Sequence, residues 1–297
     1  MDFELFKQKI YDQGRDLEVA IFNTLFENDD RSMVAYALSI YQNKDGGFGH
    51  GLEPDSTNPN SSPFQTSVAL EILVDVGFRD NNLDEYTKDL VNRAFKYLVK
   101  TMNDDLWPAT IPSNNDFPCA VWWMHDPNKT QTINPTGSIL ASTILLANKN
   151  TSGYKSALAM ATKHIQAYLN TPCHEKHELA VLARLYHALK EEEPQFELLS
   201  QFKEKLFKEI QTSIDPVDAW EGYATFPFDF PLDDENYGID SKVIQASLAY
   251  LKKTLRTNYW EPSWQWYKDE DTFEIQSIKW HGILINKFLS YISHIQK

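Results

Sequence analysis

The chain has 297 residues, a formal charge of −14 and only two cysteines. A chain of this length buries enough apolar surface to need no disulfide framework or structural metal, and two cysteines cannot build such a framework. The strong negative charge opposes non-specific binding to nucleic acid and to anionic lipid, so we expect neither as a partner.

Nothing in the sequence predicts export or insertion into a membrane. Asp2 and Glu4 stand where a signal peptide has basic residues. The most apolar stretch, 136–147, is interrupted by serine and threonine and is too short for a membrane span. We therefore expect a cytoplasmic protein with no membrane span.

Helical periodicity dominates the whole chain, and the alternation typical of strands is almost absent. In the segment 31–42, for example, Val34, Leu38 and Tyr41 recur at i, i+4 and i+7. The pattern predicts eleven helices, at 2–12, 16–28, 31–42, 63–77, 84–102, 135–148, 152–169, 174–190, 195–213, 239–256 and 274–295.

Several helix starts carry capping signals. Ser62-Pro63, Asn134-Pro135 and Thr171-Pro172 each place a capping residue before a proline, which fits the first helical position. Asp240 or Ser241 is expected to cap the helix that follows Gly238.

The segment 214–238 predicts a short twelfth helix. Asp215-Pro216 again combines a cap with a proline, and the helix would run through Trp220 and Tyr223. Twelve helices would form about six antiparallel hairpins, the number that a closed double ring of helices requires. An all-α fold of the α/α toroid type is therefore expected, with an open helical solenoid as the alternative.

Two distant segments resemble each other. The stretch Tyr97–Met102, followed by Trp107, matches Tyr250–Leu255, followed by Trp260, with every matched residue 153 positions later. The tyrosine, a leucine, a lysine, the threonine and the tryptophan are identical in both. This internal similarity favours an architecture made of repeats.

The segment 41–49, Tyr-Gln-Asn-Lys-Asp-Gly-Gly-Phe-Gly, resembles the glutamine/tryptophan-type repeat of squalene cyclases and the Asp-Gly-Gly-Phe turn of prenyltransferase subunits. Glycine permits positive φ at the end of a helix, so we expect Phe48 to fold back between adjacent helices. With the segments 45–55, 118–123, 134–136, 220–229 and 260–264, the chain resembles a group of bacterial prenyltransferase-like toroid proteins of similar length. The resemblance implies one toroid domain over 1–297 and a ligand cavity, but no particular activity.

The acidic motifs that terpene cyclases and prenyltransferases use are incomplete. No Asp-x-Asp-Asp cluster is present, and Asp233–Tyr237 begins as Asp-Asp but lacks the closing aspartate of a magnesium motif. Cys173, His174 and His177 stand at the start of a helix, where a zinc site and an ordinary helix start remain open alternatives. We predict no metal and no cofactor.

The best candidate for catalysis is the cluster of His50, Glu53 and Asp55, which follows the glycine-rich turn. An imidazole and two carboxyl groups suit general acid–base chemistry if they face one cavity. Asp229, between two phenylalanines, is the next candidate acid. The alternative is structural: helix caps for the carboxylates and a loop carbonyl for the histidine.

Aromatic residues gather in the long connections and are the candidates for ligand binding. They either line a pocket or anchor their loops by packing. The predicted ligand-binding residues are Trp122, Trp123, Trp220, Tyr223 and Trp264.

Three classes of function remain open. An isoprenoid-like ligand, bound or transformed in a central cavity, follows from the resemblance alone. A carbohydrate lyase or hydrolase is the alternative that paired acids and tryptophan platforms favour. A non-catalytic toroid that binds a peptide or protein is the third.

Overall fold

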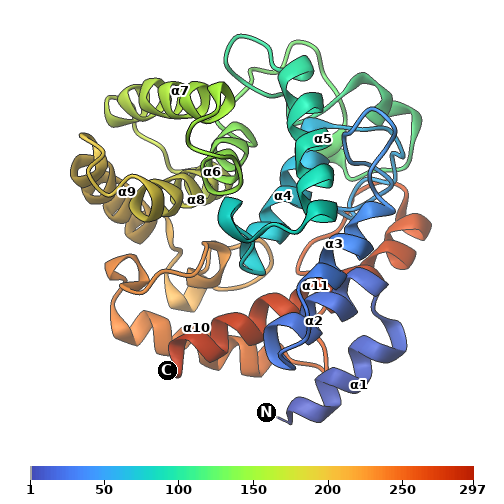
Figure 1. Cartoon of the computed structure of the whole chain (residues 1–297). Coiled ribbons are helices and arrows are strands. Elements are labelled where there is room, and N and C mark those ends of the chain that lie inside the picture. Colours follow the sequence, from blue (N-terminus) through green and yellow to red (C-terminus); the bar gives the residue numbers. More distant parts are fainter. Residues whose placement is uncertain (1) are drawn as a thin grey trace.

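The computed structural model describes residues 2–297, and this part of the chain forms helices with no β-strand longer than an isolated bridge (Figure 1). The α-helices are α1 (Phe3–Gln13), α2 (Asp16–Phe26), α3 (Ser32–Ser39), α4 (Pro63–Asp75), α5 (Glu85–Thr101), α6 (Thr136–Leu146), α7 (Ser152–Leu169), α8 (Lys176–Glu192), α9 (Leu199–Ser213), α10 (Ser241–Thr254) and α11 (Glu270–Ile295). The short 3₁₀ helices are η1 (Asp80–Asn82), η2 (Pro112–Asp116), η3 (Val121–Trp123), η4 (Val217–Ala219), η5 (Pro227–Asp229) and η6 (Asn236–Gly238). All eleven predicted helices are confirmed, with ends shifted by at most four residues.

The predicted twelfth helix is wrong. In its place the chain closes a loop, because Asp215 and Thr225 exchange two hydrogen bonds: the Asp215 N–H donates to the Thr225 carbonyl (3.2 Å) and the Thr225 N–H to Asp215 Oδ2 (2.7 Å). Trp220 Nε1 donates to the Asp215 carbonyl at 2.8 Å, and Gly222 has φ +54°. These bonds satisfy groups that a helix would have paired internally, so between Asp215 and Thr225 only η4 is helical.

Two of the predicted helix starts are confirmed and two are wrong. The Ser62 side chain accepts from the Gln65 N–H and the Asp240 side chain from the Lys242 N–H, as caps do. In α6, however, Pro135 itself is in the cap position, without a side-chain bond. The start of α8 lies after Thr171-Pro172, because the carboxylate of Glu175 caps it by accepting from the Glu178 N–H.

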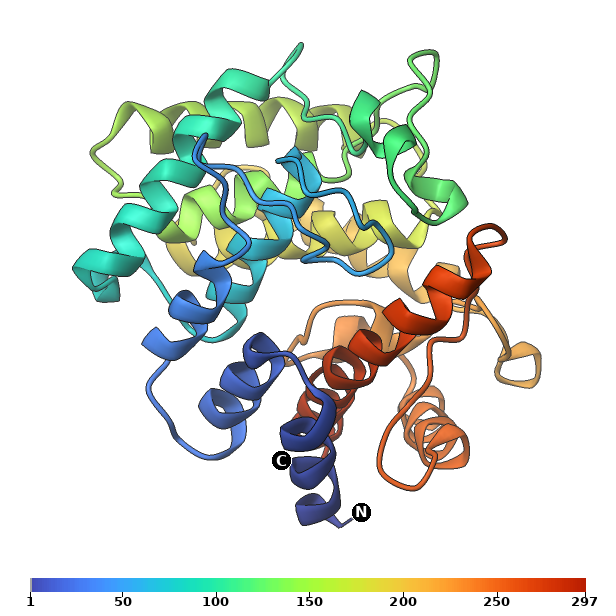
Figure 2. The same ribbon diagram turned by 90° about the vertical axis from the view of Figure 1, so that its right-hand side faces the viewer.

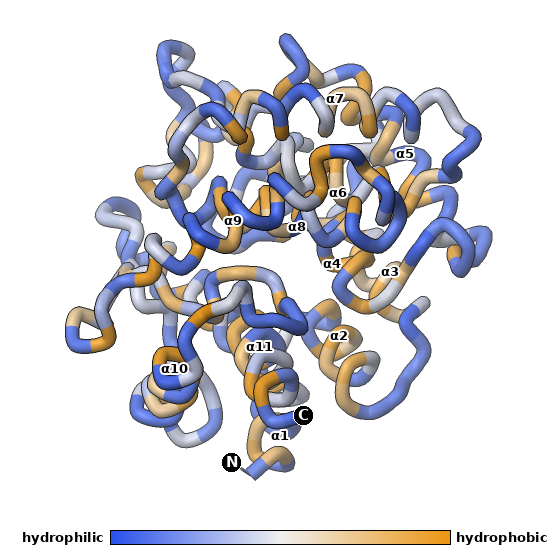
Figure 3. Tube along the Cα trace, turned by 90° about the vertical axis from the view of Figure 1, so that its left-hand side faces the viewer, coloured by the Kyte–Doolittle hydropathy of each residue, from blue (hydrophilic) through white to orange (hydrophobic). Residues whose placement is uncertain are grey.

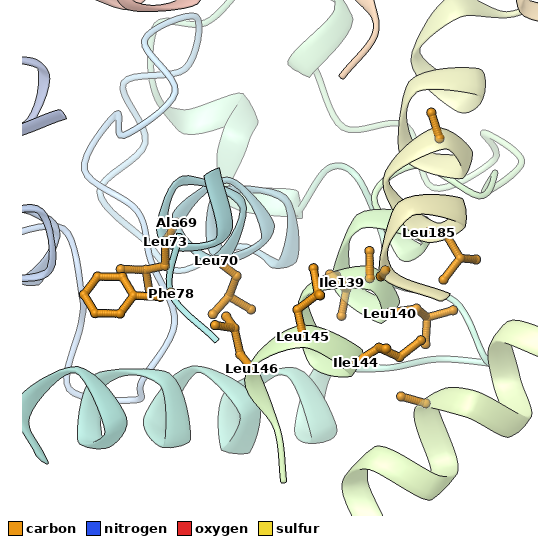
Figure 4. Packing of buried hydrophobic residues seen from close by; sticks show 14 of the residues in the cluster. Ala69, Leu70, Leu73, Phe78, Ile139, Leu140, Ile144, Leu145, Leu146 and Leu185 are labelled. Carbon is orange, nitrogen blue, oxygen red and sulfur yellow. The ribbon is translucent and has the colours of Figure 1, made fainter. Parts of the chain in front are cut away.

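The helices α4, α6 and α8 pack side by side and are enclosed by their neighbours. Ten of the eleven residues of α6 are buried, as expected for a helix that is covered on all sides. Close packing requires Gly137, since a Cβ there would lie 2.9 Å from the Val181 carbonyl oxygen of α8. Figure 4 shows Leu70 of α4 pointing toward Leu145 and Leu146 of α6, with Leu185 of α8 beyond them.

The helices α5, α7 and α9 cover α4, α6 and α8, respectively. Each buries one face only: in α5 the buried residues recur at helical spacing, and the rest of the helix is polar. The same mixture of hydrophilic and hydrophobic residues along α9 is visible in Figure 3. The chain thus alternates enclosed helices with amphipathic ones.

The two ends of the chain meet. The N-terminal helix α1 packs against the C-terminal helix α11, which also contacts α2, and both termini lie at the same end of the molecule in Figures 1 and 2. From α2 the contacts pass to α3, then to α4 and α5, and along α6 to α8 and α9. Segments that are distant in sequence therefore lie beside one another.

The internal repeat has the same geometry in both copies. Trp107 Nε1 donates to the Leu98 carbonyl and Trp260 Nε1 to the Leu251 carbonyl, both at 2.8 Å. The threonine of each copy bonds back to the carbonyl of the tyrosine four residues earlier. The matching residues thus make the same hydrogen bonds at the ends of α5 and α10.

The buried hydrophobic residues form two clusters. The larger one contains residues of α2 to α9. The second combines α1, α10 and α11 with Trp220, Phe226 and Phe228, and Ile214 packs against both clusters. Within residues 2–297, none of the helices combines the length and the apolar character that crossing a bilayer demands.

Candidate functional site

The glycine-rich turn between α3 and α4 carries the first candidate residues. Gly46 has φ +95°, and a Cβ there would lie 2.3 Å from the Arg93 carbonyl oxygen of α5, so only glycine fits. Phe48 is fully buried in the larger core, as expected from the turn motif. The turn is thereby fixed against α5, and the chain that follows it is directed toward the carboxyl groups at 53 and 55.

Three separate segments meet around residues 53–57. The Glu53 N–H donates to Gln65 Oε1 of α4 at 2.8 Å. The Asp55 carbonyl accepts from the Ala120 N–H at 2.8 Å, and the Val121 N–H reaches the Trp266 carbonyl at 3.3 Å. The loop before α4, the loop before α6 and the loop before α11 therefore form one site.

Asp55 is buried and accepts hydrogen bonds from three tryptophans. Its Oδ1 accepts from Trp266 Nε1 (2.9 Å) and Trp280 Nε1 (2.8 Å), and its Oδ2 accepts from Trp264 Nε1 (2.9 Å). Burial raises the pKa of Asp55, and the three indole N–H groups oppose that shift because they stabilise the charged form. The arrangement is suited to hold a negative charge without a neighbouring cation.

Glu53 lies two residues away in a contrasting environment. Its Oε2 is buried and has no hydrogen-bond partner. Burial, followed by the negative charge of Asp55, raises the pKa of Glu53 well above its ordinary value, and the weaker effects of the Asp55 backbone N–H, Trp123 and Arg15 oppose this. The pair therefore combines a carboxyl group that favours its acid form with a carboxylate that is held by donors.

Trp123 completes this cluster. Its indole N–H faces the Glu53 carboxyl and lowers its pKa, but the N–H is buried without reaching hydrogen-bond geometry to any partner. The Trp123 ring packs on Phe64 with centroids 4.2 Å apart. Both rings line a small recess, which has room for about one water molecule. Glu53 Oε2 and the Trp123 indole N–H are thus both buried without a hydrogen-bond partner.

A second group of candidate residues lies where α8 begins. Lys176 Nζ lies 3.4 Å from Asp229 Oδ2, and Lys287 Nζ of α11 lies 3.8 Å from Asp229 Oδ1. Lys176 also donates to the carbonyls of Tyr223 (3.2 Å) and Ala224 (3.1 Å). Its ammonium group stands 3.8 Å from the centre of the Tyr223 ring.

This group is partly open to solvent. The Lys287 side chain is 43% exposed, yet burial lowers the pKa of its amine, and the positive charges of Lys176 and Arg184 add to this. Tyr223 is 58% exposed, yet burial raises its pKa to about 12, with contributions from Glu175, Asp229 and Asp55. The charge of Asp55 also contributes to the raised pKa of Tyr223, so the two groups of residues lie near enough to interact.

The remaining predicted residues lie outside these two groups. His50 is exposed and its Nε2 bonds Asn43 Oδ1 at 2.9 Å. Trp220 is buried in the second core and packs on Phe226 and Tyr250. Trp122 is half-buried in η3, and no bond joins it to the two acids.

The possible zinc ligands have other partners. Cys173 Sγ lies 3.6 Å from Glu178 Oε2, and His177 bonds Glu175 and Tyr223. Among residues 2–297, no three histidine, cysteine, aspartate or glutamate side chains are grouped in a way that would hold a metal ion.

The structure brings the candidate residues Glu53, Asp55, Trp123 and Trp264 together, and it adds Trp266 and Trp280, which the sequence did not predict as partners of Asp55. No sequence signal joins these tryptophans to Asp55, because the need of a buried carboxylate for several N–H donors is evident only once its burial is known. A comparison with models of protein families, with curated proteins and with solved structures finds no match to this chain.

Proposed function

We propose that this chain is an α/α toroid of the prenyltransferase and terpene-cyclase type, a single domain, in which Glu53 donates a proton to a small ligand. The observation that carries the proposal is the pair of unlike carboxyl groups. Asp55 has three indole donors, whereas Glu53 Oε2 is buried with none. A general acid that works at neutral pH needs a raised pKa of this kind.

The packing order supports a ring. Enclosed helices alternate with amphipathic ones from α4 to α9, as expected for an inner and an outer layer. The residues Lys176, Asp229 and Lys287 connect α8, η5 and α11, and α11 returns to α2. The partly exposed surface around Lys287 and Tyr223 would then face the centre of the ring, and we propose that the ligand lies there and extends to Glu53.

An isoprenoid-like ligand is the class we favour, because the sequence resembles prenyltransferase-like toroid proteins and the Trp123 indole lies beside the Glu53 carboxyl. Glu53 would protonate an alkene carbon, and the Asp55 carboxylate and the aromatic rings would stabilise the cation that forms. The two cysteines are free thiols, which fits the reducing conditions of the cytoplasm.

Deuterium incorporation tests the proposal. The protein is incubated in heavy water with two isoprenoid alkenes, squalene and farnesol. Mass spectrometry of the recovered ligand then measures the incorporated deuterium. We expect incorporation with the wild type and with Glu204→Gln, an exposed glutamate of α9, and a loss of at least about a hundredfold with Glu53→Gln. Unchanged incorporation with Glu53→Gln contradicts the assignment.

The half-exposed tryptophans Trp264 and Trp280 make a sugar the alternative ligand. The same preparation is therefore titrated with cellotetraose, with tryptophan fluorescence as the signal. Binding of the oligosaccharide without any effect of the isoprenoids would replace the proposed function by the carbohydrate alternative.

A further inference from the structure

The residues at the start of α8 form a chain of hydrogen bonds that the proposed function does not use. Glu175 Oε1 lies 2.6 Å from His177 Nδ1, and His177 Nε2 lies 2.9 Å from the Tyr223 hydroxyl. A carboxylate, an imidazole and a hydroxyl in this order are the arrangement by which enzymes activate a hydroxyl group.

The chemistry of the three side chains determines which atom donates and which accepts in each hydrogen bond. Burial raises the pKa of Glu175, but hydrogen bonds from His177 and from the start of α8 outweigh it, so the net shift is downward and the group is a carboxylate. A carboxylate only accepts, so Nδ1 of His177 carries the hydrogen. Nε2 of the neutral ring then accepts, and the Tyr223 hydroxyl donates to it.

The three hydrogen-bonded side chains are open to a ligand, and the bond between His177 and Tyr223 is not required to hold the loop. The side chains of Glu175 and His177 are 50% and 49% exposed, and Tyr223 is exposed as well. Lys176 already anchors the loop through the carbonyls of Tyr223 and Ala224. The same ammonium group lies over the Tyr223 ring at 3.8 Å, where it favours negative charge on that ring.

We propose that Glu175, His177 and Tyr223 form a proton relay that accepts a proton from a hydroxyl group of a ligand. The ligand O–H gives its proton to the Tyr223 oxygen while the Tyr223 proton passes to Nε2 of His177. The ligand oxygen keeps the electron pair of the broken bond, and the imidazolium is balanced by Glu175. The relay extends the proposed function, since it supplies a base in addition to the acid Glu53, but its test needs no ligand.

The test measures how fast benzenesulfonyl fluoride labels each tyrosine, with peptide mapping by mass spectrometry. The phenol oxygen attacks sulfur, fluoride leaves, and the phenol proton goes to His177. The pKa of Tyr223 is raised to about 12, so little phenolate exists at neutral pH and fast labelling requires a neighbouring base. Tyr267, which is 75% exposed, is the internal control.

We expect Tyr223 to be labelled at least about tenfold faster than Tyr267. The advantage should disappear in His177→Asn and fall partly in Glu175→Gln, where an amide no longer fixes the imidazole tautomer. The Tyr267 rate in each variant corrects for the activity of the reagent, and labelling of Tyr237, which is 2% exposed, would show that a variant has unfolded.

Two results would overturn the relay: labelling of Tyr223 no faster than that of Tyr267, or a Tyr223 rate that His177→Asn leaves unchanged. Failure of the relay is distinguishable from failure of the proposed function, because the labelling test uses no isoprenoid ligand and the deuterium test uses no sulfonyl fluoride, so each can fail while the other succeeds.

Discussion

The region around Asp55 and the region around Tyr223 differ in how their polar groups are satisfied. Asp55 is 3% exposed and has three indole donors from two segments more than 200 residues later in the chain. Tyr223 is 58% exposed, and its partner His177 is equally accessible. Substitutions in the buried region should therefore reduce stability first, whereas substitutions in the exposed region should reduce reactivity without unfolding the protein.

The largest expected effect follows from Asp55→Ala. The change leaves three indole N–H groups without their acceptor, and unpaired buried donors cost about 1–3 kcal/mol each. We expect the free energy of unfolding to fall by at least about 3 kcal/mol, measured by urea denaturation. Asp116→Ala, at an exposed aspartate of η2, is the control and should change it by less than about 0.5 kcal/mol. Equal losses of stability in the two variants would contradict the structural role of Asp55.

Substitutions of the tryptophans that donate to Asp55 should lower the free energy of unfolding by different amounts. Trp266 is fully buried and Trp264 only half-buried, although both donate to Asp55 at 2.9 Å. Phenylalanine removes the N–H and part of the ring volume, so Trp266→Phe should cost about 2–3 kcal/mol and Trp264→Phe about 1 kcal/mol. Denaturation of the two variants side by side checks the order, and a reversed order would contradict the burial argument.

The substitution Glu53→Gln should change how stability depends on pH. Because the pKa of Glu53 is raised in the folded protein, its contribution is fully present below the ordinary value of 4.5 and is lost as the pH rises through the folded value. We expect the wild type to lose stability over that window and Glu53→Gln to lose less, measured by thermal unfolding from acid to neutral pH. Glu204→Gln should follow the wild type. Identical curves for all three proteins would contradict a raised pKa of Glu53.

The smallest effect on stability is expected from Tyr223→Phe. The ring remains and still packs under the Lys176 ammonium group, and only an exposed hydroxyl is lost. The free energy of unfolding should change by less than about 0.5 kcal/mol, measured by urea denaturation. A loss above about 2 kcal/mol would make the hydroxyl a structural anchor.

Sequence patterns predicted the helices well because apolar spacing and packing agree along nearly the whole chain, as in α3 and α5. They failed at 214–225, where the Asp215–Thr225 bonds replace a helix that local signals favoured. The Gly-Gly-Phe turn and the Glu53–Asp55 pair were recognisable because their residues are consecutive. The partners Trp266, Trp280 and His177 were not, since their role depends on which loops the fold brings together.

The central claim is that Glu53 carries a proton where an ordinary glutamate is ionised. A ¹³C NMR titration of the side-chain carboxyl carbons, with the Glu53 signal assigned by its absence in Glu53→Gln, measures this directly. The structure predicts that Glu53 remains in the acid form well above the ordinary value of 4.5 and ionises at higher pH than Asp55. A Glu53 carboxyl that ionises at or below 4.5 would contradict the account.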